Sequence, residues 1–299
     1  MSALRDLATA LTFLTRLPVS RFASGDPSAL ARATSWFPLV GLIIGSVLAL
    51  VVLALDAVLP TGVAVVVVLA LGVLLTGGLH EDGLADVADS AGAFSAEKKL
   101  AVMRDSRVGT YAVLALALLV VARYAVVGEL AVTDWTIVIA ALVAAHVLAR
   151  WSSVLLMAWL PSARTQGANA STAQGVTGAQ LLRSAALAGV CLVPVAILDG
   201  PGALLAVPVA LAVTTLAGLW FRRSFGGITG DCLGAATIAV EISVLIAVVT
   251  LHGGVGLRGL KEPRRRRGQP ARGAPTATPL DRVKGRRRRV WSRLPESNR

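Results

Sequence analysis

The chain has 299 residues, of which 55% are hydrophobic and only 15% are charged. Soluble domains average roughly 25% charged residues, so this composition and a mean hydropathy of +0.72 exclude an ordinary soluble enzyme and indicate a protein embedded in lipid. The net charge of +12 would suit nucleic-acid binding, but residues 1–257 carry 14 basic and 14 acidic residues and residues 258–299 carry 15 and 3. The excess charge therefore belongs to the tail, and we expect no nucleic-acid partner.

We expect no signal peptide in the first residues of the chain, because charged residues interrupt each apolar run. Apolar residues at helical spacing predict a helix over residues 2–17 that lies along the membrane interface. The alternative for this segment is a frayed terminus.

Long apolar stretches predict an all-α fold, a polytopic bundle of about seven transmembrane helices. A helix needs about 20 apolar residues to cross about 30 Å of hydrocarbon. One of the stretches is short and contains Pro194. The seven stretches cover residues 36–59, 62–79, 109–131, 135–160, 184–200, 202–221 and 232–252.

Basic residues in the connecting segments predict the orientation, because cytoplasmic loops are enriched in Lys and Arg. With the N-terminus in the cytoplasm, the inner segments contain 12 Lys or Arg and the outer turns contain none. We therefore expect a multi-pass protein of the cell (inner) membrane with its N-terminus cytoplasmic. The inner segments are residues 1–35, 80–108, 161–183 and 222–231.

The sequence divides into a membrane-embedded catalytic domain, 1–257, and a basic tail, 258–299. Residues 261–299 are rich in Arg, Pro and Gly, cannot bury a core and are expected to be disordered. We interpret the tail as an extension with no part in the chemistry. The alternative is a cytoplasmic tail that binds anionic lipid, which requires one span fewer.

The strongest candidate site is the acidic segment Thr76–Ser90, which follows directly on the second apolar stretch. If it is helical, Asp82, Asp86 and Asp89 lie within about 60° of arc on one face. Three neighbouring carboxylates repel one another unless a cation neutralises them, and oxygen ligands favour Mg²⁺, Mn²⁺ or Ca²⁺ over Zn²⁺. These three aspartates are therefore our candidate metal ligands, with Mg²⁺ favoured because it pairs with substrate phosphates.

Two neighbours of these acids are less specific signals. Gly83 removes a side chain where a bulky ligand would approach the backbone. His80 could orient a carboxylate, ligate the metal or simply form a hydrogen bond. A solvated acidic loop would explain the whole cluster, but the other inner segments are basic and carboxylates at a membrane boundary are costly without a partner.

A second motif lies at the start of the third span. Arg104 and Arg107 are three residues apart, and guanidinium groups match the geometry of phosphate. Gly109 and Thr110 open the next helix, whose free amides would favour an anion. Asp105 is either a metal ligand or a partner for Arg104. The alternative is that the arginines only anchor the loop in the cytoplasm.

A third motif, Arg222–Asp231, opens the last span. Gly226, Gly227 and Gly230 precede Asp231, an arrangement that could expose backbone amides to a phosphate and bring Asp231 near the acidic cluster.

Ionisable residues inside the spans are further functional candidates. His146 and Arg150 are four residues apart in the fourth span, and Glu241 lies in the last. A structural pair between Arg150 and Glu241 is the alternative. We expect Arg123 to lie near the outer end of its helix and to extend its guanidinium to the interface.

These motifs resemble those of the cobalamin synthase family, the adenosylcobinamide-GDP ribazoletransferases. They occur in the family's order and spacing over about 1–252, whereas residues 161–183 match poorly and the tail has no counterpart. The matching segments are Phe13–Pro18, Phe37–Gly41, Gly77–Asp89, Met103–Thr110 and Gly226–Gly234.

The resemblance implies a reaction. The family joins adenosylcobinamide-GDP to α-ribazole, or its 5′-phosphate, giving adenosylcobalamin, or its phosphate, and GMP, in a late nucleotide-loop assembly step. It is Mg²⁺-dependent and membrane-embedded. By this resemblance, Arg104 and Arg107 clamp phosphate oxygens, with Gly226, Gly227 and Asp231 also binding substrate. Other enzymes of the corrinoid pathway are possible partners.

The resemblance also gives the acids their roles. Asp82, Asp86 and Asp89 match the family pattern of metal-binding, catalytic aspartates, and one of them, for which we name Asp89, acts as base. Glu81 occupies the variable position of that pattern and is not expected to be essential.

Three other classes compete with this interpretation. A CDP-alcohol phosphatidyltransferase-like enzyme would have an Arg where this chain has Asp86. A transporter would show interrupted repeats and acids at the midplane, whereas these acids cluster at one face. A membrane scaffold with a basic tail would not need the acidic cluster.

Overall fold

The computed structural model describes residues 2–26, 28–163 and 176–259. The regular elements in these residues are all helices. Extended backbone pairs in them only at an isolated bridge between Ser162 and Ile228. The all-α prediction is confirmed. The chain divides into two units, Met1–Arg258 and Gly259–Arg299. The tail that we expect to be disordered lies, from residue 260 onward, outside the described residues.

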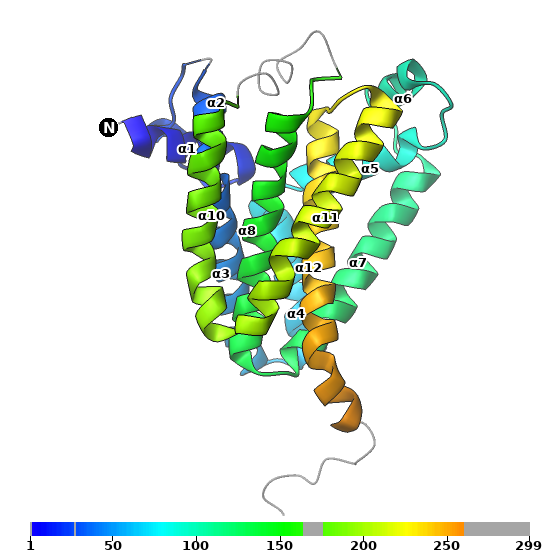
Figure 1. The fold of residues 1–299 in the computed structure, drawn as a ribbon. Coiled ribbons are helices and arrows are strands. Elements are labelled where there is room, and N and C mark those ends of the chain that lie inside the picture. Colours follow the sequence, from blue (N-terminus) through cyan, green and yellow to red (C-terminus); the bar gives the residue numbers. More distant parts are fainter. Residues whose placement is uncertain (1, 27, 164–175, 260–299) are drawn as a thin grey trace, which may run out of the picture. The chain divides into compact units, whose positions relative to one another are not determined.

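Seven long helices form the body of the first unit, as far as the structure describes it (Figure 1). Six are long and apolar enough to cross a membrane, and the bent pair α4 and α5 is a further candidate. The predicted apolar helices are therefore confirmed. Their bounds are α3 (Phe37–Asp56), α4 (Thr61–Thr76), α7 (Thr110–Ala131), α8 (Trp135–Trp159), α10 (Gly178–Leu198), α11 (Gly200–Phe225) and α12 (Gly230–Gly259).

Helix α10 differs most from its predicted start, beginning at Gly178 and not at residue 184. The reason is a capping box, in which the Thr177 hydroxyl accepts from the Gln180 amide and the Gln180 side chain accepts from the Thr177 amide. The cap allows a polar first turn to extend the apolar helix, which continues through Pro194.

Helix α8 lies at the centre of the bundle and packs against α3, α10 and α11. Of its most apolar 18-residue stretch, 83% is buried. Glycines on α3 make the closest of these contacts possible. A Cβ added to Gly45 would lie 2.7 Å from the carbonyl oxygen of Leu142, and one added to Gly41 would collide with the carbonyl of His146. Small residues of this kind let transmembrane helices approach closely.

A sharp bend separates α4 from α5 (Leu79–Ser90), where the sequence predicted one span over residues 62–79. Gly77 and Gly78 adopt positive φ angles of 68° and 69°, a conformation that glycine adopts without steric cost. The two helices therefore meet at 88°. The guanidinium of Arg16 lies against Gly77, where any Cβ would collide with it.

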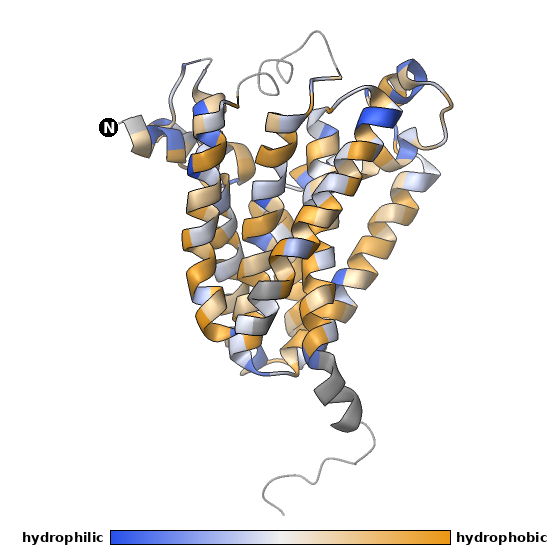
Figure 2. Cartoon of the chain, in the orientation of Figure 1, coloured by the Kyte–Doolittle hydropathy of each residue, from blue (hydrophilic) through white to orange (hydrophobic). Residues whose placement is uncertain are grey.

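The shorter helices gather at one end of the bundle, where Figure 2 shows many of the hydrophilic residues. The N-terminal helix is confirmed as Ser2–Leu14 and lies across the long helices in Figure 1. Because the predicted inner segments meet at this end, it is where we look for a site. The elements are α1 (Ser2–Leu14), α2 (Ala29–Ala33), α5 and α6 (Ala96–Val102), with 3-10 turns η1 (Ser20–Phe22) and η2 (Thr34–Trp36).

Candidate active site

The acidic segment forms a helix, α5, as predicted. Gly78 precedes its first residue in a left-handed conformation, and Glu81 and Asp82 occupy the first turn, where carboxylates favour the positive end of the helix dipole. Asp82 is exposed, whereas Asp86, one turn later, is half-buried.

A cavity of about 160 Å³ lies beside α5 and brings distant segments together. His80 and Asp82 line it from α5, and Asp231 lines it from the start of α12. Phe13 of α1 and Phe37 of α3 contribute apolar surface. The cavity thus combines two carboxylates with aromatic walls, an arrangement typical of a small-molecule site.

The close approach of α5 to α12 places Asp231 near the acidic helix, as predicted. A Cβ added to Gly83 would lie 2.8 Å from the carbonyl oxygen of Asp231 and 3.2 Å from the Cα of Gly234. Gly83 therefore leaves room for α12, and the expectation that it leaves room for a ligand is corrected. The Asp231 carboxylate accepts a hydrogen bond from Thr229 at 3.2 Å.

Asp89 joins α5 to α7. Its carboxylate accepts the backbone amide of Gly109 at 2.6 Å and that of Ala112 at 2.8 Å. The amides at the start of α7 do bind an anion, as the sequence suggested, but that anion is a side chain of the protein itself.

The three aspartates do not form a self-contained metal cluster. In the described ranges, no three His, Cys, Asp or Glu side chains gather closely enough to hold an ion by themselves. Asp82 faces the cavity, whereas Asp89 faces α7. Any ion held here would need ligands from the substrate or from water as well.

The two arginines of the second motif lie outside the cavity. Arg104 and Arg107 are exposed and neither is among the described residues that line the cavity. Asp105 pairs with Arg107 at 2.6 Å, not with Arg104 as one alternative held. Hydrogen bonds from the side chain and amide of Arg107 lower the pKa of the Asp105 carboxyl to about 2.

The glycine motif has a structural use that its sequence did not reveal. Gly226 ends α11 with a φ of 76°, and a Cβ on Gly227 would collide with the carbonyl of Pro161. The amide of Ile228 donates to Pro161 at 2.9 Å, and that of Ala163 donates to Ile228 at 2.8 Å. Gly226 and Gly227 thus fit the turn against residues 161–163, and Gly230 and Asp231 reach the cavity.

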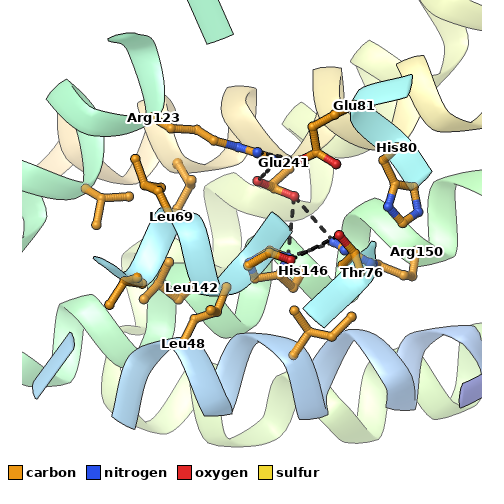
Figure 3. Close-up of a pocket in the computed structure, with 15 residues that line it drawn as sticks. Leu48, Leu69, Thr76, His80, Glu81, Arg123, Leu142, His146, Arg150 and Glu241 are labelled. Atoms are coloured by element: carbon orange, nitrogen blue, oxygen red, sulfur yellow. Dashed lines mark hydrogen bonds and ion pairs between the residues drawn. The ribbon is translucent and has the colours of Figure 1, made fainter. Parts of the chain in front are cut away.

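The ionisable residues inside the bundle form a connected buried network (Figure 3). Arg150 and Glu241 pair at 3.4 Å, as one alternative from sequence held. The expectation that Arg123 extends to the interface is wrong, because its guanidinium pairs with Glu241 at 2.7 Å and with Glu81 at 2.6 Å. A charge inside a bilayer is costly without a partner, and here the partners are on other helices.

The chain matches the cobalamin-5-phosphate synthase family over residues 6–249. It belongs to that family. No solved structure matches it.

Curated relatives of the cobalamin-5-phosphate synthase type resemble the chain over most of their length. A protein from Shewanella amazonensis is 39% identical over 81% of this chain and 94% of its own. Proteins from Shewanella baltica and Ralstonia nicotianae are 37% and 36% identical, over 78% and 81% of this chain and 89% and 94% of theirs. All three are named adenosylcobinamide-GDP ribazoletransferase.

The sequence motifs that suggested the cobalamin-5-phosphate synthase family converge on the cavity. The segments Phe13–Pro18, Phe37–Gly41, Gly77–Asp89 and Gly226–Gly234 each supply lining residues. The fifth, Met103–Thr110, is joined to α5 through Asp89. The first two segments entered the sequence analysis only as signs of resemblance, and it is the structure that places Phe13 and Phe37 on the cavity.

Proposed function

We propose that this chain is an adenosylcobinamide-GDP ribazoletransferase and that the cavity beside α5 is its active site. It joins adenosylcobinamide-GDP to α-ribazole, or to its 5′-phosphate, and completes the nucleotide loop of cobalamin or of its phosphate. The observation that supports this site is the convergence of four family motifs on one cavity with Asp82 and Asp231.

The reaction is a phosphoryl transfer in which a phosphoester bond to ribazole replaces the phosphoanhydride bond to GMP. A ribazole hydroxyl oxygen bonds to the phosphorus attached to cobinamide, the bond from that phosphorus to the GMP oxygen breaks, and GMP leaves with the electron pair. A carboxylate on the cavity takes the hydroxyl proton. Asp82 and Asp231 lie where a carboxylate could do so, whereas the Asp89 oxygens are bonded to α7 amides.

We propose Mg²⁺ as the cofactor, with Asp82 and Asp86 as its protein ligands. The donor set fits, because Mg²⁺ is commonly held by one or two carboxylates together with substrate phosphates and water, so a cluster of three acids is not required. When bound, Mg²⁺ neutralises charge on the diphosphate. Asp89, which the sequence pattern includes as a ligand, instead holds α5 against the start of α7.

Arg104 and Arg107 remain our candidates for binding a phosphate group or the corrinoid part of adenosylcobinamide-GDP. Both are exposed, and Arg107 is held by Asp105 in an exposed pair. Exposed pairs contribute little stability, so a substrate phosphate can replace Asp105 at small cost. Gly226 and Gly227 act indirectly in this proposal, by shaping the turn that presents Asp231.

The proposed location is the inner membrane with the α1, α5 and α6 end in the cytoplasm. The 12 basic residues of the predicted inner segments support this orientation through the positive-inside rule. The substrates are large and polar, so they would reach a cytoplasmic cavity without crossing the bilayer. We also propose association with other corrinoid-pathway enzymes, which co-purification from native membranes would test.

The reaction is tested by supplying membranes that contain the full chain with adenosylcobinamide-GDP and α-ribazole. Cobalamin and GMP in equal amounts are the expected products, and both should disappear when either substrate is left out or when a chelator removes Mg²⁺. Transfer to a lipid alcohol in place of ribazole would contradict the proposal and favour a phosphatidyltransferase-like enzyme. Unchanged turnover in the presence of the chelator would contradict the proposal that Mg²⁺ is the cofactor.

A further inference from the structure

A second, smaller cavity of about 30 Å³ lies next to the proposed active site, and His80 lines both cavities. Figure 3 shows the ionisable side chains that surround it. They are His80 and Glu81 of α5, Arg123 of α7, His146 and Arg150 of α8, and Glu241 of α12.

Glu241 is at the centre of this group and is 4% exposed. One of its oxygens contacts Arg123 at 2.7 Å, and the other lies 3.4 Å from both His146 and Arg150. Arg150 also contacts His146 at 2.7 Å. Glu241 therefore ties α12 to α7 and α8 in the middle of the bundle.

Arg123 extends the group to the acidic helix. One nitrogen of its guanidinium contacts Glu241 and another contacts Glu81 at 2.6 Å, with the Arg123 and Glu81 side chains 11% and 17% exposed. The two glutamates and the two arginines have formal charges that cancel. Because one planar guanidinium bridges two acids, Arg123 adds a rigid side-chain link between α5 and α12 to their backbone contact at Gly83.

The orientation of α5 depends on such contacts because α4 does not set it. Two glycines with positive φ angles form the joint between the helices, and glycine is the least restricted residue. Glu81 and Asp82 are consecutive, so their side chains point about 100° apart around α5. Glu81 points into the network and Asp82 into the active-site cavity. A rotation of α5 that released Glu81 would move Asp82 as well.

We propose that Arg123 is a positioning residue for the transfer reaction, holding Glu81 and Glu241 together so that Asp82 faces the cavity. This inference rests on the proposed function. It also gives Glu81 a role that its place in the sequence motif did not suggest.

The test compares Arg123→Lys and Glu81→Gln with the full chain in lipid nanodiscs. Lysine keeps the charge but cannot bridge both acids as a guanidinium does, and glutamine removes the charge that faces Arg123. His252→Gln is the matched control, because it breaks the His252–Asp199 contact of 3.1 Å elsewhere on α12. Three quantities are measured: Tm, kcat and the hydrogen exchange of the amides in residues 79–90.

We expect both test variants to lower kcat about 10- to 100-fold at temperatures where they remain folded, since small displacements of reacting groups have effects of that size. The KM values should change little, and exchange in residues 79–90 should be faster. The control should lower Tm without either effect. If Glu81→Gln does not accumulate, Arg123→Lys decides the matter alone.

A wild-type kcat and wild-type exchange in Arg123→Lys would overturn the proposal and leave the network as a source of stability only. If the unaltered chain makes no cobalamin, the proposed function fails. The exchange measurement then still tests whether Arg123 holds α5 in place. Slow exchange in residues 79–90 of Arg123→Lys would refute this role, and faster exchange there but not in the control would support it.

Discussion

Asp89 shows how one carboxylate of a motif can have a different task from its neighbours. It shares a helix with Asp82 and Asp86, but its oxygens accept two amides at the start of α7. Those amides have no intrahelical partner, since the first turn of a helix leaves its donors free. A buried donor that loses its acceptor costs about 1–3 kcal/mol.

We therefore expect Asp89→Ala to lower the stability of the chain by about 1–3 kcal/mol, measured as a lower Tm in detergent or nanodiscs. Glu129→Gln is the control, because Glu129 is an exposed acid near the far end of α7, the helix whose first amides Asp89 accepts. Equal Tm values for the two variants would contradict the role of Asp89 as the acceptor that joins α5 to α7.

The buried network could be predicted only in part from single residues. The sequence suggests that Arg150 and Glu241 could pair, because each needs a partner inside a span. It does not suggest that Arg123 meets Glu81, since that contact exists only because α5 turns by 88° and lies beside α7. The bend itself depends on φ angles at Gly77 and Gly78, and a pair of glycines is compatible with several turns.

At the scale of elements, the contact of α5 with α12 assembles the cavity. Gly83 of α5 faces the backbone of Asp231 and Gly234 at distances that leave no space for a side chain. This contact brings a segment near residue 82 and one near residue 231 to the same cavity. The sequence predicted that the two motifs share a membrane face, but it could not show which glycine lies at the crossing.

Gly83→Ala should therefore separate α5 from α12. An added Cβ would lie 2.8 Å from the Asp231 carbonyl oxygen, and overpacking of this kind costs about 1–3 kcal/mol. We expect a lower Tm and a lower kcat. Gly189→Ala provides the comparison, because nothing lies within 4 Å of its added Cβ and alanine is the better helix former. If Gly83→Ala were as stable as Gly189→Ala, the close crossing would be refuted.

At the scale of the whole molecule, the fold was predictable from apolar stretches because hydrocarbon permits few alternatives to helices. The site was less predictable. Substrate binding was predicted for Arg104, Arg107, Gly226 and Gly227 from the chemistry of these residue types, because the sequence does not show where they lie relative to the cavity. In the described structure the last two shape a turn, and the substrate roles of the first two stay predictions.

The orientation in the membrane can be tested with two cysteine variants of the full chain. Phe94→Cys lies in the segment after α5 and Val58→Cys in the turn before α4, where the native side chains are 101% and 76% exposed. The native Cys191 and Cys232 are buried and should contribute little background. A membrane-impermeant maleimide applied to intact cells should label only Val58→Cys. Labelling of Phe94→Cys alone would reverse the orientation.

Residues 261–299 should be dispensable for the chemistry, since the family match ends at residue 249. A chain that ends at residue 260 should make cobalamin with the kcat of the full chain. The amount of protein in the membrane is measured in parallel, so that an effect on accumulation is not taken for one on turnover. A lost kcat in a normally inserted truncated chain would assign the tail a part in the reaction.

The most direct test of the active site compares Asp82→Asn with Asp89→Asn in cobalamin formation from adenosylcobinamide-GDP and α-ribazole. Both variants remove one charge from the same helix, but only Asp82 faces the cavity, and the asparagine at residue 89 retains an oxygen that can accept an amide. We predict that Asp82→Asn lowers kcat at least about 100-fold without changing Tm, whereas Asp89→Asn lowers Tm and retains most of its turnover. Loss of turnover in Asp89→Asn together with wild-type turnover in Asp82→Asn would contradict the account and move the reaction away from this cavity.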